Sequence, residues 1–308
     1  MRNGVPSGTD ERIALGLVIP AGLLGVLLAW ALGGVPAAST VRFCADIAGA
    51  AVLGLTLAPR LADRIEVPWR MLAGLAGLWC CLEFATSIFA AGEVVGSGVT
   101  ALSPADFGTY LLRISAGQIG LVILAATAGI ALYAAVAFRR PGQRSADLVL
   151  VFAAVCVTLR PITGHMSQQP AGSVLAAVHA LAASTWLGLL LALGLVVRGR
   201  RGWAEALPGY SAVALPMIAA VALTGVLNGL VRLGGFAAFF TTGYGRIMLA
   251  KSILLAILLV LGWWWRRSWV AAAAAHRISA AASLRRAVLE VAVMAVVFGL
   301  AASLAITG

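Results

Sequence analysis

The sequence has little charge, little histidine, and no cysteine pattern typical of a zinc site or a disulfide framework. Only 11% of the 308 residues are charged, three are histidine and four are cysteine. All four cysteines lie within apolar segments without a Cys-x-x-Cys motif, so nothing indicates a zinc site or a disulfide scaffold. There is no phosphate-binding loop, nucleophile motif or sizeable polar domain. The sequence therefore predicts that the protein is not an enzyme and does not hydrolyse ATP.

Apolar residues dominate what is present. The chain is 62% hydrophobic, and its apolar runs have membrane-spanning length. A net charge of +11 could indicate a nucleic-acid partner in a soluble protein, but the arginines fall between the apolar runs and form no single basic face. We expect no nucleic-acid partner. The predicted fold class is all-α: a polytopic transmembrane helical bundle in contact with the lipid bilayer, with residues 1–308 forming one transmembrane domain.

The apolar runs predict nine transmembrane helices, with eight as the alternative. A spanning helix needs about 20 apolar residues, and each run approaches or exceeds that length. The predicted spans cover approximately residues 13–32, 41–58, 69–91, 110–138, 147–164, 172–197, 211–231, 245–265 and 287–307.

Arginine distribution orients these spans. Of the 22 basic residues, 16 fall on alternate connections, which the positive-inside rule places in the cytoplasm. They are Arg2, Arg12, Arg60, Arg64, Arg70, Arg139, Arg140, Arg144, Arg198, Arg200, Arg201, Arg266, Arg267, Arg277, Arg285 and Arg286. The amino terminus is then cytoplasmic and the carboxyl terminus lies outside. Trp263, Trp264, Trp265 and Trp269 stand beside one of these arginine groups and predict an interfacial aromatic belt.

The remaining polar residues of the spans gather on the predicted outer side, whereas the cytoplasmic halves lack such groups. Charged groups at membrane depth are costly and usually pair or line a wet cavity, so this outer polar cluster predicts a vestibule open to the outside. Its members are Asp46, Glu83, Arg113, Arg160, Asn228, Arg246 and Lys251, with Arg42 and Arg232 on the same side. The alternative is that these residues end helices, snorkel and pair locally, as Arg42 and Asp46 could at i, i+4 spacing.

A weak internal repeat suggests a transporter-like architecture. Phe107-Gly108, then Arg113, an apolar run and two arginines are similar to Tyr244-Gly245, then Lys251, an apolar run and two arginines. The units lie four spans apart and share an orientation, as in a parallel repeat. We expect Lys251 and Arg113 to pair with Asp46 and Glu83 and so to hold the two units together.

Two histidines and a methionine suggest a copper site. His165 and Met166 close one predicted span, and His179 lies about two turns inside the next. Imidazole and thioether are ligands suited to copper, the thioether to Cu(I) in particular. A short uncharged loop joins the two spans, so we predict a metal site of His165, Met166 and His179 at the outer face. The alternative for each histidine is a packed, hydrogen-bonded residue. The four cysteines are soft enough to bind Cu(I), but a buried cysteine usually acts as a small hydrophobic residue.

Several stretches around these residues together resemble the copper resistance D (CopD/PcoD) family. They are Thr163-Gly164-His165, His179 with Trp186-Leu187-Gly188, Thr224-Gly225-Val226-Leu227-Asn228 and Thr241-Thr242-Gly243-Tyr244-Gly245-Arg246 with Lys251. The resemblance covers residues 149–267, the CopD-like core region. Ala176 stands where many members have an acidic residue, and Gly243 replaces the family's proline.

The resemblance implies a bacterial inner-membrane protein that imports copper, contributes to copper homeostasis and resistance, and works with a periplasmic copper-binding protein. Two alternatives share many of these residues: a haem-binding redox membrane protein with imidazole ligands, and a non-transporting copper-delivery or assembly subunit.

Overall fold

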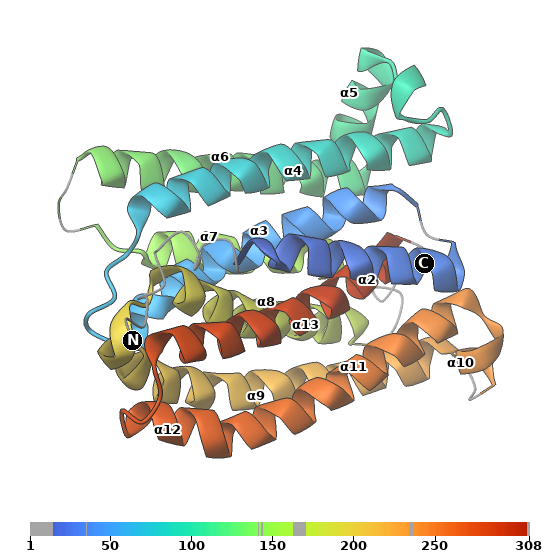
Figure 1. Ribbon diagram of the computed structural model, residues 1–308. Helices are drawn as coiled ribbons and strands as arrows, with labels where there is room; N and C mark the ends of the chain where they lie inside the picture. Colours follow the sequence, from blue (N-terminus) through green and yellow to red (C-terminus); the bar gives the residue numbers. More distant parts are fainter. Residues whose placement is uncertain are drawn as a thin grey trace.

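The computed structural model describes residues 15–34, 36–140, 142, 144–162, 171–233 and 237–306, with the side chains of residues 230–233 outside this description. Within these ranges the protein is helical and contains no strand, which confirms the predicted all-α bundle. Nine long helices lie roughly along one axis, and α2 begins and α13 ends at opposite ends of the bundle (Figure 1). They are α2 (Val18–Gly33), α3 (Ala38–Leu57), α4 (Trp69–Val95), α6 (Ser115–Arg139), α7 (Asp147–Ile162), α8 (Gly172–Val196), α9 (Gly199–Leu233), α11 (Gly243–Trp265) and α13 (Ala280–Ile306).

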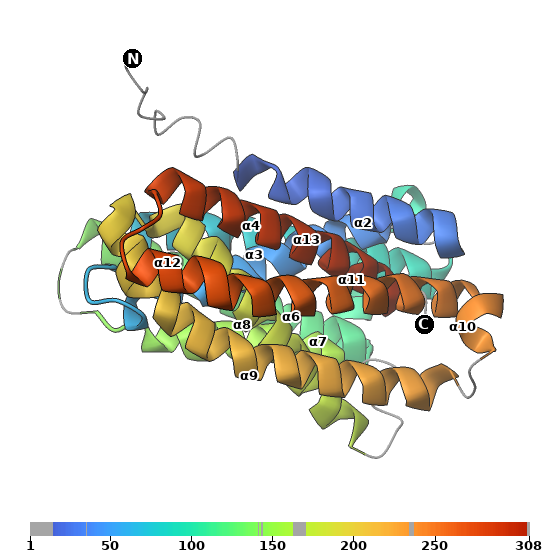
Figure 2. The same ribbon diagram turned by 60° about the horizontal axis from the view of Figure 1, so that its bottom comes forward.

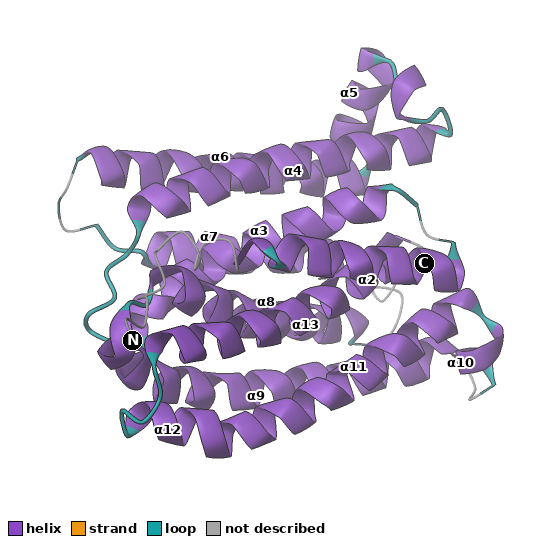
Figure 3. Ribbon diagram, viewed as in Figure 1, coloured by secondary structure: helices purple, strands orange, loops and turns teal. Residues whose placement is uncertain are grey.

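Each of the nine predicted spans corresponds to one of these long helices. Seven of the described helices are long and apolar enough to cross a membrane, and α2 is a shorter apolar helix. At a rise of ~1.5 Å per residue, the 16 residues of α2 and of α7 extend about 24 Å. Figure 3 shows the short elements that join the long helices: the turns η1 (Ala58–Arg60) and η2 (Val99–Ala101), the helices α5 (Pro104–Arg113), α10 (Ala238–Thr241) and α12 (Ala271–Ala274), and the π-helix η4 (Arg266–Val270).

The predicted span 110–138 begins too early, because the chain forms two helices there. Ser103 caps the first, α5, by accepting a hydrogen bond from the amide of Asp106 at 3.1 Å, and Pro104 occupies the first helical position. Ile114 is extended, with ψ 131°, and separates α5 from α6. Arg113 therefore ends a short helix at the predicted outer end (Figure 1) instead of lying within a long spanning helix.

The predicted span 211–231 also has the wrong start. Helix α9 begins at Gly199, runs for 35 residues and contains Pro208 and Pro216 in its interior. A hydropathy window places a boundary where arginines accumulate, but a helix can continue past the apolar region into water. Arg200 and Arg201 accordingly lie in the first turn of α9, not in a connection.

The bundle contains one local structure twice, at the corner between α5 and α6 and at the corner between α10 and α11. The register of this repeat differs from the one predicted from the sequence. Gly117 and Gly245 are each the third residue of a long helix, α6 and α11. Any Cβ on them would collide with the backbone carbonyl seven residues earlier, that of Tyr110 in α5 and of Ala238 in α10. The corner between the short and the long helix is thus built alike in both halves. Gly245 therefore corresponds to Gly117, not to Gly108.

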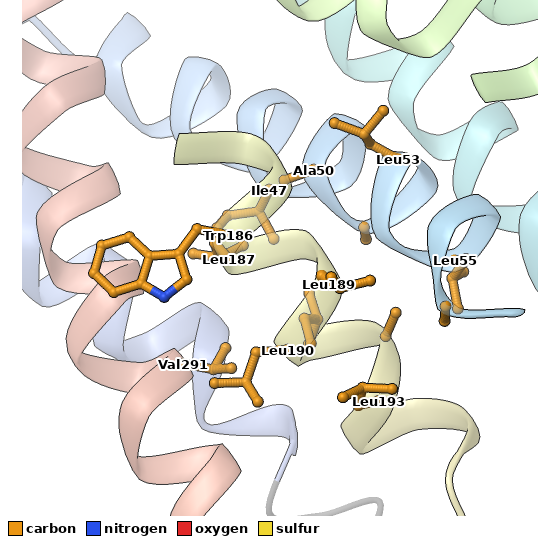
Figure 4. Packing of buried hydrophobic residues seen from close by; sticks show 14 of the residues in the cluster. Ile47, Ala50, Leu53, Leu55, Trp186, Leu187, Leu189, Leu190, Leu193 and Val291 are labelled. Carbon is orange, nitrogen blue, oxygen red and sulfur yellow. The ribbon is translucent and has the colours of Figure 1, made fainter. Parts of the chain in front are cut away.

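The core of the bundle is the crossing of α3 and α8. A Cβ on Gly54 would collide with the backbone of Gly188, and one on Gly188 would collide with that of Ala50. At this close approach Leu53 and Leu187, which flank the two glycines, are almost completely buried (Figure 4). Helices α4, α7 and α13 pack against α3, and α7, α9 and α13 pack against α8, so this crossing lies at the centre of the bundle.

The two halves differ in how their next helices pack. In the first half, α4 packs along α6, whereas α9 and α11 share few contacts and separate toward the predicted outer end (Figure 2). At the other end the rings of Trp203 and Trp265 each pack against Trp269, with centroids 6.1 and 5.8 Å away, and join α9 to η4. Trp265 and Trp269 are buried, so their predicted place in an interfacial belt is wrong.

Trp263 and Trp264 are exposed, as an interfacial belt requires. The guanidinium of Arg267 lies 4.3 Å from the ring centroid of Trp263. This aromatic-cationic pairing marks the predicted inner end of α11.

Candidate functional site

The predicted copper ligands fall in two parts of the chain. His165 and Met166 lie outside the described residues, so their role stays a prediction. His179 is the eighth residue of α8, and its imidazole faces α9 near the predicted outer end. His276, the third histidine, lies in the turn before α13 at the opposite end of the bundle and does not face His179.

The imidazole of His179 is oriented by a hydrogen bond to α9. Its Nδ1 lies 2.8 Å from Oγ1 of Thr224, whose hydroxyl donates its only hydrogen to the carbonyl of Ala220 at 2.5 Å. With that hydrogen on Ala220, the threonine oxygen is left to accept, and we assign the imidazole hydrogen to Nδ1 of His179 on this basis. The carbonyl of Val221, which lies beside Thr224 Oγ1, also accepts from the imidazole. This tautomer leaves Nε2 with a free lone pair, the state of a histidine prepared to bind a metal.

Glycine and asparagine extend this arrangement along α9. The Cα of Gly225 faces the ring, and an added Cβ would come within 3.6 Å of Cε1 of His179. Asn228 lies one turn beyond Thr224, and its Oδ1 is buried without a hydrogen-bond partner among the described residues. A buried unpaired carbonyl oxygen is uncommon in native proteins, and an approaching cation or donor would satisfy it. The face of α9 that lies toward His179 thus offers a second atom, Oδ1 of Asn228, that is available to coordinate a metal.

Helix α11 contributes a positive charge to the same place. Lys251 lies close enough to act electrostatically on the imidazole of His179. Among the described residues, none forms an ion pair or hydrogen bond with its ammonium group. We call His179, Thr224, Asn228 and Lys251 the α8–α9 site. Its imidazole favours a metal cation, whereas its ammonium opposes one.

The α8–α9 site does not by itself form a complete metal centre. Nowhere in the described ranges do three or more His, Cys, Asp or Glu side chains come together as a metal would need. All four cysteines are free thiols. A copper ion at His179 would therefore need further ligands, and the predicted ones, His165 and Met166, lie in the segment between α7 and α8.

The acidic members of the outer polar cluster pair with arginines of their own part of the bundle. Asp46 binds Arg42 one turn away on α3, with Nε and Oδ1 2.9 Å apart, as the i, i+4 spacing predicted. Glu83 of α4 accepts from Nε and Nη2 of Arg160 of α7 at 2.9 and 2.7 Å, both at Oε2. Its Oε1 accepts from the indole of Trp79 at 3.2 Å. The prediction that Lys251 and Arg113 pair with these carboxylates is therefore wrong.

The outer polar cluster consequently divides into separate places instead of surrounding one vestibule. Arg42, Asp46, Glu83 and Arg160 interact with one another between α3, α4 and α7, and their formal charges cancel. Arg246 donates to the carbonyl of Leu32 at 3.0 Å and closes the end of α2, while Arg113 is exposed. Only Lys251 and Asn228 belong to the α8–α9 site with His179.

One buried acid was missed by the sequence reasoning, which placed no charged group in the cytoplasmic halves. Glu290 of α13 is only 5% exposed, and Oε1 accepts a hydrogen bond from the hydroxyl of Tyr210 of α9 at 3.3 Å. The signal in the sequence was a single carboxyl group at residue 290, shortly after two arginines. The predicted span starts at residue 287, so Glu290 was read as a residue at the helix end, whereas α13 starts seven residues earlier at Ala280.

Comparison with known protein families agrees with the two-part architecture. Residues 35–173 match the family model described as copper resistance protein D-like, N-terminal domain, and residues 204–304 match the model described as copper resistance protein D. The first match covers α3 to α7, and the second covers most of α9 through α13. Neither the curated proteins nor the solved structures gave a match to the chain. On the evidence of both halves, the chain belongs to the copper resistance protein D family.

Proposed function

We propose that this protein carries copper across the bacterial inner membrane into the cytoplasm and so contributes to copper homeostasis and resistance. Membership of the copper resistance protein D family and the seven candidate membrane spans support this proposal. The arginine pattern supports a cytoplasmic amino terminus and a periplasmic carboxyl terminus. Copper is cargo in this proposal, so the protein performs no chemical reaction and is not an enzyme.

The observation that carries the proposal is the orientation of His179. Thr224 fixes its tautomer and leaves Nε2 unprotonated, at the end of the bundle where α9 and α11 separate. Asn228, one turn beyond Thr224 on α9, has a buried and unpaired amide oxygen that could serve as a further ligand. We propose that His179 receives the ion, and that His165 and Met166 capture it from a periplasmic copper-binding protein. The thioether of Met166 makes Cu(I) the species carried.

Lys251 gives this site a property that suits a transporter. An ammonium group that acts electrostatically on the imidazole raises the free energy of a bound cation, and more strongly at membrane depth than in water. Conduction requires binding that is strong enough for entry and weak enough for release. Lys251 therefore shortens the time that copper spends at His179.

Copper titration of purified variants tests the site. The wild-type protein should bind one Cu(I), and His179→Ala should abolish stoichiometric binding. Thr224→Val removes only the oxygen that orients His179 and should weaken binding by roughly ten- to a hundredfold. His276→Ala, at the far end of the bundle, is the matched control and should bind as the wild type does. Wild-type affinity in the double variant His165→Ala, His179→Ala would move the site elsewhere. A Soret band in the purified protein would instead favour the haem alternative.

A further inference from the structure

Glu290 holds a buried carboxyl group about one turn inside the predicted span 287–307, on the inner side of the α8–α9 site. It is the eleventh residue of α13, about 15 Å from the start of the helix and about 24 Å from its end. Its neighbours are core residues, and Val291 next to it packs against α8 (Figure 4). A carboxyl in this position needs a reason, because ionisable groups are rare within the membrane and usually functional.

The groups around this carboxyl are hydrogen-bond donors, not cations. The hydroxyl of Tyr210 donates to Oε1 at 3.3 Å. Trp186 projects from α8 toward α13 (Figure 4), and its indole nitrogen lies beside Glu290 and Tyr210. That nitrogen makes no hydrogen bond of good geometry and is buried, with Trp186 only 5% exposed. It is therefore a buried donor without an acceptor, next to an acid.

No counter-ion reaches Glu290 among the residues that the structure describes. Tyr210 is the one titratable neighbour that acts on the carboxyl. Of the other helices packed against α13, α2 carries no titratable residue in its described length. The titratable residues of α3 and of α11 lie in their outer parts, and none of them acts on Glu290. Arg286, one turn before Glu290 on α13, forms no ion pair with it.

Glu83 shows how a buried acid with a cationic partner is arranged in the same protein. The two glutamates are equally buried, at 4% and 5% exposure. Glu83 binds two guanidinium nitrogens of Arg160, whereas Glu290 has no cation. An isolated carboxylate in an apolar medium is far too costly to persist, and such a group stays neutral by keeping its proton. Tyr210 and the unsatisfied Trp186 provide two donors for the carboxylate when the proton leaves. The site thus accommodates both states.

We propose that Glu290 is an intramembrane proton-binding site, at which the carboxyl releases and rebinds a proton while Tyr210 and Trp186 hold the carboxylate. The ligand is the proton alone, and the site is distinct from the α8–α9 site. The proposal goes beyond copper handling and does not depend on it, since the proton site can be tested with no copper present.

A membrane-soluble carbodiimide tests this proposal on the intact wild-type protein, because the reagent modifies protonated carboxyl groups in apolar surroundings. Mass spectrometry of the labelled protein should find the adduct on Glu290, with a yield that falls as pH rises. Glu83 is the internal control: it has the same burial but is bound by two guanidinium nitrogens of Arg160, and should stay unmodified. Equal labelling of both residues, or an adduct on Glu83 alone, would overturn the proposal.

Infrared spectroscopy provides the second measurement and does not rely on access of the reagent. The wild-type protein at neutral pH should show the carbonyl band of a protonated carboxyl that Glu290→Gln lacks. The band should disappear on raising the pH, and Tyr210→Phe should shift the pH at which it disappears. If Glu290→Gln does not fold, the pH-difference spectrum of the wild type decides alone. A wild-type spectrum without any protonated-carboxyl band would refute the proton site.

Discussion

Breaking the Glu83–Arg160 pair should destabilise the protein more than breaking any other ion pair that the structure describes. The side chains are 5% and 14% exposed, and two guanidinium nitrogens bind one carboxylate oxygen. Removing one partner of a buried pair costs about 3–5 kcal/mol, because the other charge stays buried and uncompensated. Glu83→Gln keeps the size of the side chain and removes only the charge. Given about 2–4 °C per kcal/mol, we expect its unfolding midpoint to fall by roughly 10 °C.

A double-mutant cycle separates this coupling from side-chain packing. Glu83→Gln and Arg160→Gln are each destabilising, but the double variant removes both charges and should lose less than the sum, with a coupling free energy of about 1–3 kcal/mol. Arg201→Gln is the control, since its pair with Glu205 is mostly exposed and should contribute less than about 1 kcal/mol. Thermal unfolding in detergent is the assay. Additive losses in the cycle, or a Glu83→Gln midpoint equal to that of Arg201→Gln, would refute the assigned pairing.

Three further predictions concern other parts of the bundle. Lys251→Met should tighten Cu(I) binding roughly tenfold, or about 1.4 kcal/mol, without lowering the unfolding midpoint, since Lys251 has no described partner to lose; weaker copper binding in a titration would contradict the repulsive role. Gly188→Ala should destabilise the protein by several kcal/mol by forcing α3 and α8 apart, whereas Gly129→Ala, which faces open space, should leave the melting curve nearly unchanged. A reporter fused after Gly308 should be active only as a periplasmic fusion, and cytoplasmic activity would overturn the orientation or the odd number of spans.

The helical segments could be predicted from sequence because burial in a membrane depends mainly on local composition. The errors arose where a helix boundary and a change in composition do not coincide. Ile114, extended between two apolar stretches, interrupts a run that hydropathy reads as continuous. The first turns of α9 contain arginines yet remain helical, because the helix extends beyond the apolar region. A window average can show neither of these, whereas backbone geometry does.

The site was only partly predictable because side-chain partners are decided by helix packing. His179 was found from its type and position, but the partner that fixes its tautomer, Thr224, is 45 residues away on another helix. Likewise, the sequence alone does not decide which outer cation pairs with Glu83. The packing of α7 against the neighbouring helices places Arg160 within reach of it. Glu290 was overlooked because the predicted span began seven residues after the start of α13, and its partners come from two other helices. His165 and Met166, outside the described residues, stay predictions.

Copper uptake into proteoliposomes tests the central claim most directly. Vesicles that contain the purified protein and an internal Cu(I) chelator would receive external Cu(I), and the internal copper would be measured over time. The account predicts accumulation with the wild-type protein and with His276→Ala, and none above empty vesicles with His179→Ala. Equal accumulation with wild type and His179→Ala would contradict the role of His179. Tight copper binding by the wild type without any accumulation would contradict transport itself and favour a delivery subunit.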